Sequence, residues 1–326
     1  MNHKERLRAA LAGEPTDRVP ISLWGHDFAR EWSAEGLAQA TIEAYRRYDL
    51  DLVKVNPRFT YYFEAWGSRY EPTGTSQPRR LINALARIEE LADLPEIDPT
   101  EGVFGDQIEA LRLIVATIGA EVDVIQTAFN ALTIASNLLD MSPAEFVEAA
   151  AGNPAAVHAG LARISRVIAD YGVACLDAGA SGVFFATVDW GTRDAVTEDF
   201  YREYGRPYDL QVLAAVRDAP LNVLHVCRDH NLLDLLSDYP VAIFNWDVHG
   251  AGNASLQEFA SKTDRGVMGG IDLKLVQEGT AAAVQAQVKH DFGAARPARV
   301  IAAGGCSIDP GAPAANLDAI TSALRD

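Results

Sequence analysis

The sequence predicts an α/β protein built as one (β/α)₈ TIM barrel, and three observations lead to this fold class. Short β-branched or apolar runs alternate with helical patterns along the whole chain of 326 residues. Such alternation indicates βαβ units and a parallel sheet. The runs number eight, and eight strand–helix units fit a closed barrel better than a doubly wound sheet, which usually has fewer strands. No linker, low-complexity stretch or repeat divides the chain, so we expect a single domain over residues 1–326.

The predicted strands are spread over the chain in order. They are Arg18–Trp24, Asp51–Asn56, Glu121–Gln126, Gly182–Asp189, Leu221–Cys227, Val241–Asp247, Arg265–Ile271 and Arg299–Ala303. Two longer segments, about 57–118 and 128–154, follow the second and the third strand. We interpret both as insertions at the mouth of the barrel that shape a pocket.

Helical patterns fill the intervals between the strands. Between 157 and 171, apolar side chains recur at helical spacing and form one stripe, made of Val157, Leu161, Ile164 and Ile168. Thr280 is a suitable N-cap for a later helix, and Pro313 suits the first turn of the last one.

Composition limits the classes of function. A formal net charge of −17 argues against nucleic-acid binding, which needs clustered Lys and Arg. No stretch approaches the ~18 consecutive apolar residues of a membrane helix, and the first 15 residues lack the apolar block of a signal peptide. We therefore expect a cytoplasmic protein without membrane or nucleic-acid partners. Three cysteines far apart in sequence are better interpreted as thiols or metal ligands than as a disulfide framework.

Polar and ionisable residues gather after the predicted strands, where parallel barrels carry their catalytic groups. We select His26, Asp189 and Asp247 as candidate catalytic residues. The candidate substrate-binding residues are Asn56, Arg58, Gln126 and His249. The alternatives are that the two aspartates cap the following helices and that His249 is an ordinary loop histidine.

The most informative pattern is His225-Val226-Cys227. Residues i and i+2 of a strand point to the same face, so both side chains can address one metal ion. Cys306 follows the eighth strand after Gly304 and Gly305, and these glycines let the backbone approach the site closely. Three Cys and His ligands with an open fourth position are typical of a catalytic zinc. The alternative is that the cysteines are small buried hydrophobes and that His225 is a core histidine.

Two further details bear on this zinc prediction. Asp189 or Asp247 could fill the fourth position at rest. Cys175 lies in a helical run away from any strand end, so we expect it to be buried packing rather than a ligand.

With these residues in view, the chain from about residue 4 to 325 resembles the uroporphyrinogen decarboxylase superfamily. The supporting segments are LRAALAGEPTDRVPISLWG, DLVKVNPRFTYYFEAWG, HVCRD, MGGIDLKLVQEGT and AAGGCSIDPGAPAANLDAI. The resemblance implies the barrel independently of the strand count. It also implies one of two activities, because the superfamily contains tetrapyrrole decarboxylases and cobalamin-linked methyltransferases that carry a His-x-Cys…Cys zinc motif.

The matched residues favour the methyltransferase branch, which includes methylcobalamin:coenzyme M enzymes. His225, Cys227 and Cys306 fall on its zinc positions, and Cys306 stands where decarboxylases have a histidine. The decarboxylase features are incomplete. Only Arg30 remains where that branch has paired arginines, and Arg58 stands at its expected acidic position.

The resemblance therefore implies a zinc-dependent transfer of a methyl group between a corrinoid and a thiol or a small methylated substrate. The expected cofactors are Zn²⁺ and a corrinoid such as methylcobalamin, and the expected partner is a corrinoid protein. The alternatives are a uroporphyrinogen decarboxylase, which is a lyase without a metal, and a non-catalytic barrel that carries a corrinoid or a tetrapyrrole.

Overall fold

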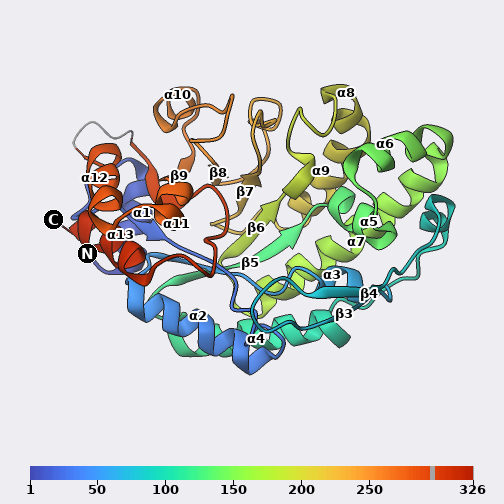
Figure 1. Ribbon diagram of the computed structural model, residues 1–326, viewed down its shortest axis with the longest axis horizontal. Helices are drawn as coiled ribbons and strands as arrows, with labels where there is room; N and C mark the ends of the chain where they lie inside the picture. Colours follow the sequence, from blue (N-terminus) through green and yellow to red (C-terminus); the bar gives the residue numbers. More distant parts are fainter. Residues whose placement is uncertain (294–297, 326) are drawn as a thin grey trace.

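Eight parallel strands form a barrel in this computed structural model, which describes residues 1–293 and 298–325 (Figure 1). Their order around the sheet is β1-β10-β9-β8-β7-β6-β5-β2. The strands are β1 (Ile21–Ser22), β2 (Leu52–Val55), β5 (Asp123–Phe129), β6 (Gly182–Ala186), β7 (Val223–Val226), β8 (Ile243–Trp246), β9 (Gly266–Ile271) and β10 (Val300–Gly304). Each lies within or overlaps one predicted strand, so the predicted fold class is confirmed.

The barrel closes where its first strand meets its second. The Asp51 amide donates to the Ile21 carbonyl at 2.8 Å, and the buried Asp51 carboxylate accepts from the Ile21 amide at 3.0 Å. Arg6 donates to the same carboxylate at 2.6 Å, and Arg18 also pairs with it. A buried carboxylate between two arginines thus joins the two end strands of the sheet.

Helices cover the outside of the barrel. They are α2 (Ala34–Tyr48), α4 (Gly102–Ile118), α7 (Pro154–Asp177), α9 (Arg206–Ala215), α10 (Leu256–Ala260), α11 (Leu273–Glu278), α12 (Ala281–Asp291) and α13 (Ala314–Arg325). The predicted apolar stripe lies on α7, and Thr280 caps α12 as expected, because its hydroxyl accepts from the Ala283 amide. Pro313 lies one residue before α13 rather than inside its first turn. None of the described helices is long and apolar enough to span a bilayer.

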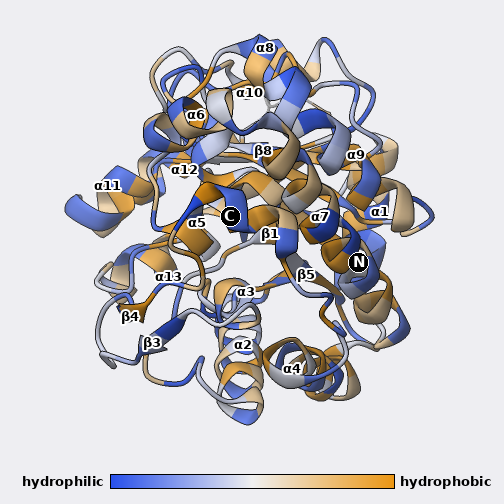
Figure 2. Cartoon of the chain, turned by 90° about the vertical axis from the view of Figure 1, so that its right-hand side faces the viewer, coloured by the Kyte–Doolittle hydropathy of each residue, from blue (hydrophilic) through white to orange (hydrophobic). Residues whose placement is uncertain are grey.

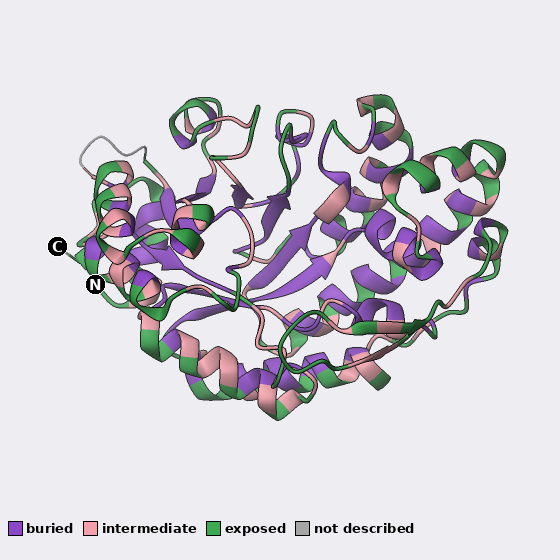
Figure 3. Cartoon of the chain, viewed as in Figure 1, coloured by how far each residue is buried: buried purple, intermediate pink, exposed green. Residues whose placement is uncertain are grey.

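The apolar core has two layers. Inside the barrel, every second side chain of most strands meets its counterparts, and Leu7 of α1 (His3–Ala12) packs against this layer. Its strand members include Leu52, Ile125, Phe184, Val223, Ile243, Met268 and Ile301. The other faces of the strands pack under the helices in a larger cluster. Figure 2 shows apolar colours on the central strands, and Figure 3 shows the same strands buried.

Additional elements follow the second and third barrel strands. After β2 come α3 (Tyr61–Glu64), the antiparallel pair β3 (Arg69–Glu71) and β4 (Arg79–Ile82), and the 3₁₀ helix η1 (Ile88–Asp93). After β5 come α5 (Ala131–Leu139) and α6 (Pro143–Gly152). The remaining short elements are η2 (Val188–Trp190), α8 (Glu198–Phe200) and the π-helix η3 (Tyr201–Gly205). The β3–β4 pair was not predicted, because its charged, mostly exposed residues show no apolar alternation.

Candidate metal centre

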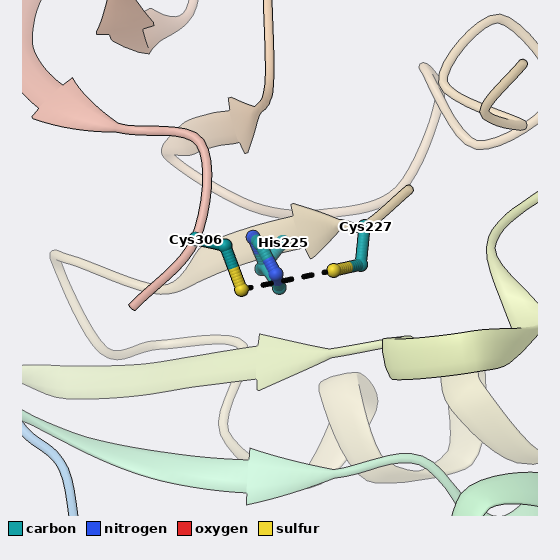
Figure 4. A group of neighbouring side chains, drawn as sticks. All are labelled: His225, Cys227 and Cys306. Atoms are coloured by element: carbon teal, nitrogen blue, oxygen red, sulfur yellow. Dashed lines mark hydrogen bonds between the residues drawn. The ribbon is translucent and has the colours of Figure 1, made fainter. Parts of the chain in front are cut away.

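His225, Cys227 and Cys306 converge at the C-terminal mouth of the barrel (Figure 4). His225 is the third residue of β7, Cys227 directly follows that strand, and Cys306 lies two residues after β10. Their ligand atoms all lie within 4.8 Å of one another, and the two sulfurs are 3.8 Å apart. Two thiolates on one tetrahedral zinc, with Zn–S bonds of about 2.3 Å, stand roughly 3.8 Å apart. The sulfurs therefore already have the spacing that a shared zinc ion requires.

Asn245 of β8 orients the histidine. The two residues are paired in the β7–β8 register, and His225 Nδ1 lies 2.6 Å from Asn245 Oδ1. The amide nitrogen of Asn245 donates to the carbonyls of Met268 at 2.9 Å and Gly304 at 3.1 Å. These two bonds fix the amide so that Oδ1 accepts from a protonated Nδ1. The Nε2 lone pair of His225 is then free for a metal ion, in the arrangement that metal-binding histidines commonly use.

Gly305 allows the Cys306 loop to reach the centre. A Cβ atom on Gly305 would lie 2.2 Å from the Cα atom of Asp247, at the end of β8. No side chain fits in that gap. The sequence predicts that the glycines before Cys306 let the backbone approach the site closely, and the structure shows this close approach at Gly305.

The two thiols of the centre lie within hydrogen-bonding distance of each other, and this contact shifts the pKa of both in opposite directions. The Cys227 thiol, assisted by the His225 ring, holds the pKa of Cys306 well below its ordinary value. The same contact, together with burial, raises the pKa of Cys227. A metal ion would deprotonate both sulfurs, because a coordinating thiol loses its proton outright. Cys175, in contrast, is fully buried in α7, as predicted, and burial raises its pKa to about 12.

Two cavities meet at this centre. The first has a volume of about 470 Å³ and is lined mainly by aromatic and polar side chains from β2, α3, β5 and β6. The second, of about 610 Å³, is lined by the acidic residues Asp189, Asp194, Asp229 and Asp247 among others. Cys227 and Cys306 line both cavities, and so does the ion pair between Arg228 and Asp189. The centre therefore borders both cavities.

Four of the other predicted site residues line these cavities. Asp189 lines both, but Arg228 engages its carboxylate, so Asp189 is not placed as a fourth ligand. Asp247 lines the second cavity, where its carboxylate accepts from the His249 amide at 3.0 Å. His26 and Asn56 line the first cavity, and His26 Nδ1 lies 2.8 Å from a Glu31 carboxylate oxygen.

The other three predicted residues lie outside the two cavities. Arg58 is buried against Trp32 and pairs with Glu64 at 3.0 Å. Gln126 points from β5 toward the outer helices, and its amide donates to the Tyr171 hydroxyl of α7 at 2.9 Å. The strand also runs on to Phe129, so Gln126 is not at its end. His249 Nε2 lies 3.1 Å from the Gly270 carbonyl oxygen. The structure thus does not bring these three side chains to the centre.

Two residues that sequence reasoning missed belong to the site. Asn245 was hidden in the apolar run IFNW, although a polar residue inside a buried strand signals a specific partner. Lys54 of β2 lines the first cavity and is buried. It stands two residues after the inward-facing Leu52, so the parity argument that selects His225 and Cys227 also selects Lys54.

Comparison with known proteins places this barrel in a family. The model of the uroporphyrinogen decarboxylase (URO-D) family matches residues 2–326, so the chain belongs to that family. Among solved structures, a methyltransferase from Methanosarcina mazei is similar, with a TM-score of 0.82 and 21% identity over 99% of this chain and 98% of that one. A B12-independent methionine synthase from Shewanella sp. W3-18-1 has a TM-score of 0.59 and 11% identity, over 94% of this chain and 98% of its own. At these identities, both similarities concern the fold. A search of curated proteins found no match.

Proposed function

We propose that this protein is a zinc-dependent methyltransferase that moves a methyl group between a corrinoid and a thiol. The observation that carries the proposal is the His225, Cys227 and Cys306 triad, with its sulfur–sulfur distance of 3.8 Å at the mouth of the barrel. The methyltransferase among its structural neighbours supports the reaction type. A zinc ion held by these three residues would keep a thiol in its open position deprotonated at neutral pH.

The reaction needs a nucleophile, a methyl donor and space for both. Zinc held by the three residues would supply a thiolate as the nucleophile, and the corrinoid would supply the methyl group. A sulfur–carbon bond would form as the bond between the methyl group and the corrinoid breaks, and that bond's electron pair would remain with the corrinoid. We assign the first cavity to the small substrate and the second to the side from which a corrinoid protein presents its methyl group. The reverse use, in which a small methylated substrate donates to the corrinoid, occupies the same two cavities.

The side chains around the centre serve this reaction in separate ways. Asn245 holds His225 in the ligand orientation, since its own amide is fixed by two backbone carbonyls. The aromatic side chains of the first cavity exclude water from the thiolate, which strengthens every charge interaction there. The pair Arg228–Asp189 stands between the two cavities, at the boundary that the methyl group crosses.

A decarboxylase reaction on a tetrapyrrole fits these residues poorly. Such a substrate carries many carboxylates, and burying each without a paired cation costs several kcal/mol. Arg30 is engaged by Asp27 at 2.8 Å and Glu43 at 2.6 Å, and Arg58 is engaged by Glu64. Arg80 and Arg228, which line the first cavity, pair with Asp140 and Asp189. These four arginines at the mouth of the barrel are therefore already paired with carboxylates of the protein.

The direct test uses methylcobalamin and a small thiol with the zinc-loaded protein, followed by absorbance as methylcobalamin is consumed. We expect demethylation that stops when zinc is removed. Cys306→Ala should reduce it by about 100-fold or more, since the metal activates the nucleophile, and Cys175→Ala should leave it unchanged. Conversion of uroporphyrinogen to coproporphyrinogen at a rate unaffected by Cys306→Ala would refute the proposal.

A further inference from the structure

Lys54 is a buried lysine that the reaction described above does not use. Its side chain is 7% exposed and lies inside the barrel, where its ammonium faces the rings of Phe184 at 4.7 Å and Trp24 at 5.5 Å. Among the described residues, no carboxylate forms an ion pair with it. Burial lowers the pKa of Lys54 to about 7, and the charge of Cys306 acts against this shift, so an anion bound beside Lys54 would favour its charged form. A cation in this position lacks the anion that buried charges normally need.

The hydrogen bonds around Lys54 leave donors without acceptors. Lys54 Nζ donates to Asn56 Oδ1, which uses one of its three N–H groups. The amide nitrogen of Asn56 is buried and has no partner in the described part of the chain. Both side chains line the first cavity. The two residues therefore direct several N–H donors, including those of an amine, toward the cavity without an acceptor among the described residues.

This pair of donors lies in the same cavity as the metal centre. Lys54 and Asn56 share the cavity wall with His225, Cys227 and Cys306. Phe184 links the two places, because its ring faces the Lys54 ammonium and stacks on His225 with centroids 5.2 Å apart. The other cations of this wall, Arg80 and Arg228, already have carboxylate partners. A small molecule whose sulfur reaches the centre thus has one free cation within the cavity.

We propose that Lys54 and Asn56 form an oxyanion-binding subsite, so that the small substrate is a thiol or a methylated compound with an acidic group such as a carboxylate. The ammonium pairs with the anion, and the Asn56 amide donates a second hydrogen bond to it. The subsite rests on the proposed function only in assigning the sulfur end of the ligand to the metal.

The test compares three thiols of similar size and different charge by calorimetry with the zinc-loaded protein. They are 3-mercaptopropionate, its neutral amide 3-mercaptopropionamide, and the cationic cysteamine. We expect the acid to bind about tenfold or more tightly than the amide, since only the acid forms hydrogen bonds in which both partners are charged. Cysteamine should bind most weakly, because its ammonium faces that of Lys54.

Two variants and one control separate the subsite from general effects. Lys54→Met should remove the preference for the acid while zinc content stays the same. Asn56→Asp should also remove it, because the new carboxylate neutralises Lys54 from within. Lys274→Met, which removes an exposed lysine, should keep the preference. Equal binding of acid and amide by the wild-type protein, or an unchanged preference in Lys54→Met, would overturn the subsite.

A thiol-free probe keeps this result distinct from the proposed function. Propionate should bind the metal-free wild-type protein, and Lys54→Met should weaken that binding about tenfold or more. If propionate binds in this way but the protein neither holds zinc nor demethylates methylcobalamin, the subsite stands and the proposed function fails. If demethylation proceeds but neither propionate nor the acidic thiol depends on Lys54, the proposed function stands and the subsite is wrong.

Discussion

Single residues decide whether the candidate metal centre is preorganised, and Asn245 is the clearest case. Its amide makes three hydrogen bonds, one with the His225 ring and two to carbonyls of the neighbouring strands. Groups that orient a metal ligand in this way typically change metal affinity about 10–100-fold when they are removed. The position of His225 Nε2 therefore depends on a residue that is not itself one of the three candidate ligands.

Asn245→Leu tests this dependence. The variant keeps the size of the side chain but removes the acceptor for His225 Nδ1, so zinc affinity should fall about 10–100-fold. The measurement is competition for zinc with a chromophoric chelator. Asn245→Asp, which keeps an acceptor, should lose less. Unchanged zinc affinity in Asn245→Leu would show that the orientation of His225 is set elsewhere.

Only part of the site could be predicted from the sequence, because only some of its residues belong to a local pattern. The His-x-Cys spacing and the glycines before Cys306 are local signals, and the three ligands they select do converge. No local pattern of this kind indicates where the side chain of Arg58 points. In the structure it forms an ion pair with Glu64, away from the cavities. Lys54 was not predicted because a lysine in an apolar strand is easily taken for a residue near the end of the strand. Its position two residues after the inward-facing Leu52 places it on the interior face.

Along each strand, side chains alternate between the barrel interior and the helices outside, and this alternation explains most of the correct and incorrect predictions. Eight apolar runs become eight parallel strands because both of their faces are buried, inside the barrel and under the helices. The misplaced Gln126 follows from the same rule, since it lies between the inward-facing Ile125 and the cavity-lining Thr127. Strand ends were harder to predict, because β5 continues three residues beyond its predicted end.

The contact between α9 and the π-helix η3 contains a buried acid with a stability consequence. The hydroxyls of Tyr201 and Tyr239 donate to Asp209 Oδ2 at 2.7 Å and 2.9 Å, while Oδ1 has no partner among the described residues. Burial raises the pKa of Asp209 from its ordinary 3.8 to about 7. The protonated form is thus favoured by folding. The stabilisation that protonated Asp209 gives to the folded state is complete below pH 3.8 and is lost as the pH rises through about 7.

Asp209→Asn should remove this pH dependence. The amide accepts the same two hydroxyls but cannot ionise. Relative to the wild type, the variant should gain on the order of 1–4 kcal/mol in the free energy of unfolding between acidic and weakly alkaline pH. Urea unfolding at pH 5 and pH 8 measures this difference. The same stability difference at both values would mean that Asp209 is already ionised at pH 5.

In the whole molecule, the barrel provides the frame, and the three residues of the candidate metal centre lie at its mouth. The barrel is closed by Asp51 and its arginines, and part of its apolar interior, including Trp24 and Phe184, lines the first cavity. This core does not include the three ligands, so we expect the fold to persist without zinc, unlike that of a zinc finger. The sequence predicts the fold class well, because the apolar pattern recurs eight times. It predicts the hydrogen-bonded surroundings of the centre poorly, because these join residues from different strands.

The zinc coordination itself tests the account most directly, and X-ray absorption at the zinc edge measures it. The zinc-loaded protein should hold about one zinc per chain with two sulfur ligands at about 2.3 Å and at least one nitrogen ligand. Addition of 3-mercaptopropionate should raise the number of sulfur ligands to about three, because the thiol fills the open position. Cys175→Ala should give the same spectra. A zinc shell with fewer than two sulfurs, or a sulfur number that the thiol leaves unchanged, would contradict a thiol-activating zinc at His225, Cys227 and Cys306.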